Sequence, residues 1–259
     1  MKDELIDQME RVQREHFWFR ARAEILLALL QPLLRPGLRV LDAGCGTGLL
    51  LSRLTGGLRL AGLDQSPRAL EHAAARLPGA ELRAGSLPGP LPFQPASQDL
   101  ILLTDVLEHI EDDAGSLLAL RDLLAPGGRL LLTVPALPTL WTRHDEEHGH
   151  FRRYTRPQLA LRLAAAGFEL EKLSYYNCLL LPLVLAVREL KRLLGRDGDD
   201  METPARPLNS LLYQVFALER HWLPRANFPL GVSLVAVARR PSSAPAGASA
   251  APQARNSAL

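Results

Sequence analysis

Short apolar runs alternate with helical segments between residues 38 and 135. Five predicted strands cover residues 38–43, 58–63, 80–84, 99–104 and 128–134. The predicted helices between them cover residues 47–55, 66–77 and 112–124. Strands that alternate with helices form βαβ units, and the resulting parallel sheet is buried on both faces. The sequence therefore predicts an α/β fold, and a chain of 259 residues is long enough to build it around a sizeable core.

Helical and polar segments flank this region on both sides. We expect a helix over residues 1–34 and assign 1–37 as an N-terminal helical extension, or lid. Downstream we expect a polar loop, a helix, a strand, a mainly helical region and a last strand, at 141–154, 155–167, 168–176, 178–224 and 231–240. Residues 38–240 then form the main domain, in which 178–224 is an inserted helical cap with a polar break at 195–207. The tail, 241–259, is rich in Ala, Ser and Pro and is predicted to be disordered.

A glycine-rich loop, VLDAGCGTG, follows the first predicted strand and precedes a predicted helix. Glycines let the chain turn tightly and let a ligand approach the helix N-terminus. The spacing differs from the dinucleotide pattern G-x-G-x-x-G, because the third glycine comes one residue early. Asp64 ends the next strand, 22 residues after Asp42, where a carboxylate can bind ribose hydroxyls. A tight βα turn without a ligand is the alternative interpretation.

The ordered set DAGCGTG, LDQSP, AGSL, LLTDVLEHI and LAPGGRLLLTVP resembles the class I S-adenosylmethionine-dependent methyltransferases. It is similar in particular to the bacterial small-molecule branch that includes quinone-biosynthesis methyltransferases. The resemblance covers residues 38–135 most closely and 150–176 less closely. It implies a Rossmann-like three-layer α/β/α sandwich, with a seven-stranded, mostly parallel sheet and an antiparallel last strand. Residues 231–240 fit that last strand, inserted in the sheet, and 168–176 fit its hairpin partner.

The resemblance also implies which residues bind S-adenosylmethionine, the expected cofactor. The loop would hold its methionine part through Asp42, Gly44, Cys45, Gly46 and Gly48. Asp64 would take the ribose hydroxyls, and the adenine would lie beside Gln65, Ser66, Gly85, Ser86 and Leu87. Thr104 and Asp105 end the fourth strand, at the switch in strand order where open α/β sheets bind ligands. The chain departs from the family at Gly85-Ser86, where the family often has an acidic residue.

Methyl transfer from a sulfonium is a direct displacement, so the protein mainly aligns the reactants. An oxygen or nitrogen acceptor also has to lose a proton, and His109 is the candidate base because histidine titrates near neutral pH. His109 follows Asp105 by four residues and can share a helical face with it. The alternative is a His109 packed beneath the pocket or bonded to a nearby carboxylate.

The loop after the fifth strand is the candidate acceptor site. Its expected contacts are His150, Arg152, Arg153 and Tyr154, together with Trp18 from the N-terminal extension. Arginines recognise carboxylates and phosphates, although Arg152 and Arg153 also fit plain surface charge. Histidines and carboxylates between 144 and 150 could suggest a metal, but their order matches no zinc pattern, so we predict none. The consecutive aromatics Phe17, Trp18 and Phe19 roof an apolar acceptor pocket or simply pack on the core.

The insertion begins with an apolar stretch, YYNCLLLPLVLAV, and continues with basic residues. Three roles stay open for it: a buried cap, a membrane-surface helix that delivers a lipid-like acceptor, or a homodimer contact. Pro182 interrupts the stretch, which is too short to span a bilayer. The N-terminus, MKDELIDQME, has no hydrophobic signal core, and the two cysteines form no CxxC pair, so we expect a cytoplasmic address and no disulfide framework.

The charge balance bears on the substrate. Thirty basic against 28 acidic side chains give a net charge of +2, which disfavours a nucleic-acid partner. We therefore expect a methyltransferase that acts on a small or lipid-like acceptor, most simply at oxygen. Two alternatives are an S-adenosylmethionine-binding partner protein with little turnover and, less favoured by the glycine spacing and the antiparallel last strand, an NAD(P)-dependent reductase.

Overall fold

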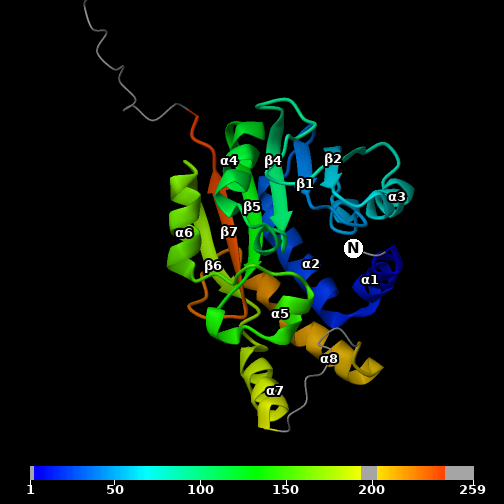
Figure 1. Cartoon of the computed structure of the whole chain (residues 1–259), viewed down its shortest axis with the longest axis vertical. Helices are drawn as coiled ribbons and strands as arrows, with labels where there is room; N and C mark the ends of the chain where they lie inside the picture. Colours follow the sequence, from blue (N-terminus) through cyan, green and yellow to red (C-terminus); the bar gives the residue numbers. More distant parts are fainter. Residues whose placement is uncertain (1–2, 194–202, 243–259) are drawn as a thin grey trace, which may run out of the picture.

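Figure 1 shows the computed structural model, which describes residues 3–193 and 203–242. The helices are α1 Asp3–Glu15, α2 Phe17–Leu30, α3 Pro67–Arg76, α4 Asp113–Leu123, α5 Arg143–Glu147, α6 Arg156–Ala165, α7 Leu181–Leu193 and α8 Arg206–Ala217. The strands are β1 Arg39–Ala43, β2 Arg59–Asp64, β3 Glu81–Ala84, β4 Gln98–Thr104, β5 Leu124–Pro135, β6 Glu169–Tyr176 and β7 Ser233–Arg239.

The strands form one seven-stranded sheet in the order β3-β2-β1-β4-β5-β7-β6. The pairs β1–β2, β1–β4, β2–β3 and β4–β5 are parallel, whereas β7 runs antiparallel to both β5 and β6. The predicted Rossmann-like α/β fold, with its antiparallel last strand inserted beside its hairpin partner, is confirmed. The strand order reverses between β1 and β4, so the chain leaves these two neighbouring strands toward opposite sides of the sheet.

Alternating side chains of the strands build a core on each face of the sheet. Leu41, Ile101 and Leu103 pack against α4 and α6, while Leu100 and Leu102 face the core that contains α2 and α8. This alternation follows from the two-residue period of a strand. The helices that cover each face give the sandwich its three layers (Figure 1).

Two predicted helices differ from the structure. The helix expected over 1–34 is broken at His16, which has an extended backbone (ψ 131°) and caps α2 by accepting a hydrogen bond from Trp18 N through Nδ1 (3.2 Å). The helix expected over 47–55 is only a 3₁₀ turn, Leu51–Arg53. Gly48 on one side and Gly56 on the other both have positive φ, which leaves too short a run for an α-helix.

Other elements lie close to their predicted positions. Thr155 caps α6 in a full capping box with Gln158. The predicted polar loop 141–154 contains the one-turn helix α5. Most of the predicted polar break at 195–207 lies outside the described residues. The same holds for the predicted disordered tail, apart from its first two residues, 241 and 242. In the part of the chain that is described, no helix is long and apolar enough to cross a bilayer.

Glu219 fixes the loop between β6 and α7. Its side chain is completely buried and accepts hydrogen bonds from three successive backbone amides, Asn177 N (2.7 Å), Cys178 N (2.6 Å) and Leu179 N (2.9 Å). Asn177 has a positive φ of 57°, so the chain turns sharply here and leaves these amides without strand partners. The carboxylate therefore supplies the acceptors that this turn requires.

We expect Glu219→Gln to lower the free energy of unfolding by about 1–3 kcal/mol, because the amide group would leave at least one buried N–H without an acceptor. Urea unfolding measures the change. The control is Glu169→Gln, which removes an exposed ion pair with Arg239 (2.5 Å) and should change stability by no more than about 0.5 kcal/mol. Equal effects of the two substitutions would contradict the role given to Glu219.

Candidate functional site

A cavity of about 570 Å³ lies at the carboxyl ends of β1 and β4. Residues of the glycine loop and of the segment after β4 form its floor, α2 and the start of α7 form walls, and the loop 148–153 closes one end. The predicted residues that line it are Asp42, Gly44, Cys45, Gly46, Thr104, Asp105, His109, His150, Arg153 and Trp18. One hollow therefore brings together the central residues of the predicted cofactor and acceptor sites.

The glycine loop is held in place by β2. Gly44 N and Cys45 N both donate to Leu63 O, at 2.7 and 3.0 Å. Asp64 accepts hydrogen bonds from Gly46 N (2.8 Å) and Ser66 N (2.9 Å). Gly44, Gly46 and Gly48 all have positive φ, so the alternating glycines of the motif are a backbone requirement. The carboxylate that was expected to bind ribose thus also orders the loop.

Five residues that line the cavity have a buried side-chain polar atom without a hydrogen-bond partner among the described residues: Asp42 Oδ1, Arg22 Nε, Glu108 Oε2, Asn177 Oδ1 and Asp105 Oδ2, the last of which is ion-paired with Arg22. Buried polar atoms in native proteins are almost always paired, so such a group indicates a polar ligand. A ligand with an ammonium group, a carboxylate and a sulfonium can satisfy acceptors and a guanidinium together. The residues present therefore fit S-adenosylmethionine.

Arg22 is a central residue that the sequence analysis did not identify. It comes from α2, forms an ion pair with Asp105 (2.6 Å) and lies over the ring of Trp18 (5.2 Å to the centroid). Thr133 Oγ1 donates to the other oxygen of Asp105 at 3.0 Å. Arg22 reaches this site only because α2 packs against the sheet. One arginine in a helix of an arginine-rich chain carries no pattern from which a role in the site could be predicted.

The carboxyl groups around Arg22 are perturbed. Burial raises the pKa of Asp42 to about 7, although the charge of Arg22 acts against this effect. Burial, reinforced by the charge of Asp105, also raises the pKa of Glu108 well above its ordinary value. Burial therefore makes ionisation of Asp42 and Glu108 costly, and a positively charged ligand would favour their ionised forms.

Two histidines stand together at the other end of the cavity. The rings of His109 and His150 are 4.6 Å apart between centroids and nearly perpendicular (81°). A ring nitrogen of each and a carboxylate oxygen of Glu108 all lie within 4.8 Å of one another. Three atoms at this spacing can share a proton or surround a small cation, and the absence of a metal stays a prediction.

His109 does not share a helix with Asp105, contrary to the sequence prediction. Asp105 has a positive φ of 55°, and His109 ends a separate 3₁₀ turn, Leu107–His109. The left-handed residue stops the chain from continuing as a helix after β4. Burial, followed by the charge of nearby His150, lowers the pKa of His109.

Asp145 is the second site residue that the sequence analysis left without a role. Its buried Oδ1 accepts hydrogen bonds from His150 Nδ1 and Arg153 Nε, each at 2.8 Å. Burial acts to raise the pKa of Asp145, but the hydrogen bonds from His150 and Arg153 outweigh it and hold this pKa well below the ordinary value. Its position in α5, five residues before His150, was a signal, but the loop was expected to be solvated.

Several predicted residues lie away from the cavity walls. Tyr154 OH donates to Asp113 (3.0 Å), and Arg152 pairs with the same carboxylate (3.1 Å). Gly48, Asp64, Gln65, Ser66, Gly85, Ser86 and Leu87 are not among the cavity-lining residues. Their roles in binding the cofactor or the acceptor stay predictions.

Helix α1 covers the glycine loop from outside. Gln13 accepts a hydrogen bond from Thr47 Oγ1 (3.2 Å), and Glu10 pairs with Arg76, which also donates to Thr47. Asp7 pairs with Arg68 (3.0 Å). Polar contacts and ion pairs thus join the first helix to the loop and to α3.

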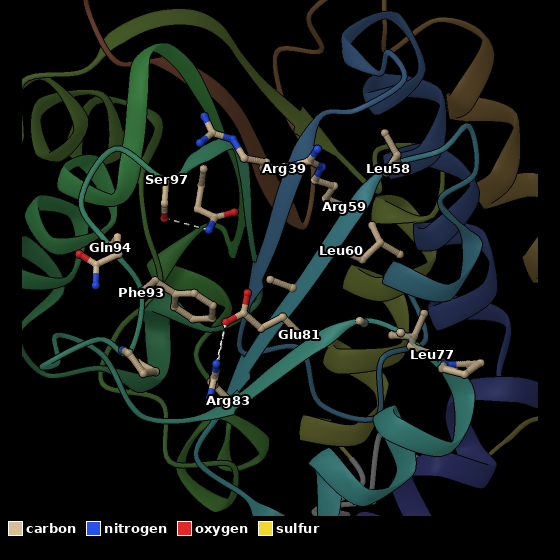
Figure 2. Close-up of a pocket in the computed structure, with 16 residues that line it drawn as sticks. Arg39, Leu58, Arg59, Leu60, Leu77, Glu81, Arg83, Phe93, Gln94 and Ser97 are labelled. Atoms are coloured by element: carbon tan, nitrogen blue, oxygen red, sulfur yellow. Dashed lines mark hydrogen bonds and ion pairs between the residues drawn. The ribbon is translucent and has the colours of Figure 1, made fainter.

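A second hollow, of about 760 Å³, lies at the opposite ends of the strands, beside the starts of β1, β2 and β3 (Figure 2). Two of its arginines are paired, Arg39 with Asp99 (2.7 Å) and Arg83 with Glu81 (3.0 Å). Ligands of open α/β sheets bind at the carboxyl ends of the strands. The cavity beside the glycine loop is therefore the candidate site.

Comparison with known proteins bears on this site. A family model described as a methyltransferase domain matches residues 11–173. A protein of Mycolicibacterium smegmatis, named a probable S-adenosylmethionine-dependent methyltransferase, is 33% identical over 160 residues, which cover 61% of each chain. A ubiquinone biosynthesis O-methyltransferase of Xylella fastidiosa is 38% identical over 158 residues, covering 53% of this chain and 63% of the relative. The matches thus span about three fifths of the length of these relatives.

Solved structures share the fold. The chain superimposes on geranyl diphosphate methyltransferase in complex with S-adenosylmethionine with a TM-score of 0.59, 18% identity and 85% coverage of each chain. It also superimposes on the methyltransferase solved with the Haloferax volcanii Trm112 activator, with a TM-score of 0.61, 19% identity and coverage of 92% of this chain and 97% of the other. At this level of identity the likeness supports the fold alone.

We expect Gly44→Ala to destabilise the protein by about 2–5 kcal/mol, the sum of a left-handed backbone penalty and overpacking. A Cβ at Gly44 would overlap the side chain of Val106, whereas one at Gly57, which also has a positive φ, would meet no neighbour within 4 Å. Gly57→Ala is thus the matched control and should cost only about 1–2 kcal/mol. Urea unfolding distinguishes the two variants. Equal losses in the free energy of unfolding would show that the Val106 side chain moves aside to accommodate the added methyl group.

We expect Asp145→Asn to cost about 3–5 kcal/mol at pH 7, because it removes one partner of a buried ion pair. The folded pKa of Asp145 lies below the unfolded value of about 3.9, so the ionised carboxylate stabilises the fold above that pH and the effect is lost as pH falls toward the folded pKa. Unfolding free energies at pH 7 and pH 3 should therefore show a smaller gap between wild type and variant at pH 3. A gap independent of pH would contradict this assignment.

Proposed function

This chain belongs to the class I S-adenosylmethionine-dependent methyltransferases, and on that premise we propose that it methylates an oxygen atom of a small or lipid-like acceptor. One observation carries the proposal. A single cavity has unpaired polar groups beside the glycine loop and a histidine pair at its other end, with apolar walls between them. The first end suits the charged cofactor, and the second suits an acceptor that must lose a proton.

Residues of the glycine loop and of α2 hold the cofactor in this proposal. Asp42 and the main chain from Gly44 to Gly46 face its methionine part, and Arg22 takes the carboxylate through a charge-assisted hydrogen bond. Asp64, which already orders the loop, takes the ribose hydroxyls. When bound, S-adenosylmethionine would supply an activated methyl group: the acceptor lone pair would form a bond to the methyl carbon while the carbon–sulfur bond breaks and its electrons stay on sulfur.

The acceptor lies against apolar side chains from the two additions to the core fold. The N-terminal extension contributes Phe17, Trp18 and Phe19, and the insertion contributes Leu183 and Val187. Leu183 and Val187 are also substantially exposed at 46% and 42%, so the apolar wall continues to the outer surface of α7. This continuity supports an apolar or lipid-like acceptor. It also fits a peripheral membrane contact or a homodimer contact through α7, and both remain proposals, as does the cytoplasmic address.

Oxygen is the favoured acceptor atom for two reasons. A hydroxyl has to be deprotonated as it attacks, which is the task that a histidine pair can perform. The name of the Xylella fastidiosa relative also specifies an O-methyltransferase, at 38% identity over part of each chain. A protein that binds the cofactor without turnover is the second candidate, because methyl transfer itself requires few dedicated side chains.

Calorimetry and labelled-methyl transfer separate these candidates. We expect S-adenosylmethionine and its demethylated product to bind to the full chain, and NADH not to bind. Incubation with methyl-labelled cofactor should then label one of a set of phenol, quinol, sugar and polyprenyl acceptors. Binding without labelling would favour the partner protein, and binding of NADH alone would overturn the proposal.

We expect Arg22→Gln to weaken binding of the demethylated cofactor by about 10- to 150-fold, the equivalent of a lost charge-assisted hydrogen bond of about 1.5–3 kcal/mol. Calorimetry measures the change in affinity. The control is Arg20→Gln, two residues away on α2, because Arg20 is exposed and stacks on Tyr213 (4.3 Å to the ring centroid). Loss of affinity in both variants would point to a general disturbance of α2.

A further inference from the structure

The histidine pair is asymmetric, and we propose that His150, positioned by Asp145, is the base that accepts the proton of the acceptor. This inference rests on the proposed methyl transfer. It also revises the sequence prediction, which gave the role of base to His109 and a binding role to His150.

His150 is held from two directions by the same residue. Its ring Nδ1 lies 2.8 Å from Asp145 Oδ1, and its backbone N donates to Asp145 O at 2.8 Å. Asp145 is itself fixed, because its Oδ2 accepts a hydrogen bond from Thr142 N (2.8 Å). Only 11% of the His150 side chain is exposed, so the ring has little freedom to rotate.

This arrangement selects one tautomer of His150. An ionised carboxylate only accepts hydrogen bonds, so Nδ1 must carry the proton that it donates to Asp145. Nε2 then keeps its lone pair and is the ring nitrogen left for the cavity, which His150 lines. The guanidinium of Arg153, 2.8 Å from Asp145, balances the buried negative charge. Asp145 therefore acts as a positioning residue.

His109 has different surroundings. Its ring forms a hydrogen bond with the main chain of His148, and among the described residues no carboxylate forms an ion pair with it, although a Glu108 oxygen lies within 4.8 Å of a ring nitrogen. A backbone carbonyl can orient an imidazole but does not stabilise an imidazolium as a carboxylate does. With the His150 ring 4.6 Å away, two protonated rings would also repel each other. His109 therefore stays neutral and positions the acceptor while His150 takes the proton.

The proton step involves only the acceptor and His150. The O–H bond of the acceptor breaks, its electron pair stays on the oxygen, and the proton forms a bond to His150 Nε2. The resulting imidazolium donates two hydrogen bonds, one of them to Asp145. After the product leaves, Nε2 returns the proton to solvent, so the residue is unchanged over the cycle.

The test compares His150→Gln with the matched variant His109→Gln on two phenols of different acidity. On phenol, which is not ionised at neutral pH, we expect His150→Gln to lose about 10²- to 10⁴-fold in kcat/KM, the usual contribution of a general base. On 4-nitrophenol, which ionises readily, the loss should be at least tenfold smaller. His109→Gln should lose the same factor on both phenols, because positioning does not depend on acceptor acidity. Equal losses of His150→Gln on the two phenols would overturn the inference.

A second readout needs neither cofactor nor turnover. Nitrogen-15 NMR of the ligand-free protein should show His150 with a protonated Nδ1 and an unprotonated Nε2, and the opposite tautomer would overturn the inference. Transfer that stops with a chelator and returns with a divalent cation would also overturn it, in favour of a metal at Glu108, His109 and His150. If the wild type methylates neither phenol while it binds the demethylated cofactor, the proposed acceptor chemistry fails instead.

Discussion

The ion pair between Arg22 and Asp105 is the interaction on which the site depends. Asp105 follows β4 with a left-handed backbone, and its carboxylate joins β5 through Thr133 and α2 through Arg22. Buried charges are tolerated only when they are paired, and Arg22 also faces the buried carboxyl of Asp42. Arg22, Arg153 and Arg188 all line the cavity, yet burial still raises the pKa values of Asp42 and Glu108. A cofactor that carries an ammonium and a sulfonium would stabilise the ionised forms of these two acids, so its charges suit the electrostatics of the pocket.

The N-terminal helices and the segment between β6 and β7 complete the cavity. Asn209, on α8, accepts a hydrogen bond from Phe17 N (2.8 Å) and donates to Glu15 O (2.8 Å), so it bridges the break between α1 and α2. A residue of the insertion thereby fixes the direction in which the N-terminal extension crosses the sheet. The sheet and the glycine loop position the residues that are proposed to bind the cofactor. The extension and the insertion provide the apolar walls, so differences in acceptor between relatives are expected to arise from these two segments.

The parts that the sequence predicted well depend on local patterns. Strand alternation, the glycine loop and the Thr155 cap each need only neighbouring residues, and these elements lie where they were expected. Two errors have local causes, the left-handed backbone at Gly48 and Gly56 and at Asp105, and the others concern contacts between distant segments. The break at His16 is secured by Asn209, 193 residues away, and the importance of Arg22 depends on its pairing with Asp105 across the fold. The residue pattern of one segment cannot predict such a contact, because the contact also depends on a partner residue elsewhere in the chain.

The two N-terminal helices are attached in physically different ways, and this difference matters for turnover. In α2, Ile25, Leu26 and Leu30 are completely buried, so its position and that of Arg22 belong to the hydrophobic core. Helix α1 is joined to α3 by the half-exposed pair Asp7–Arg68, which contributes little to stability, and by the largely buried pair Glu10–Arg76. Among the described side chains, α1 buries the apolar residue Ile6, whereas α2 buries six residues, so displacing α2 costs more. The cofactor has to be exchanged in every cycle, and the anchoring of α2 in the core keeps Arg22 beside Asp105 from one cycle to the next.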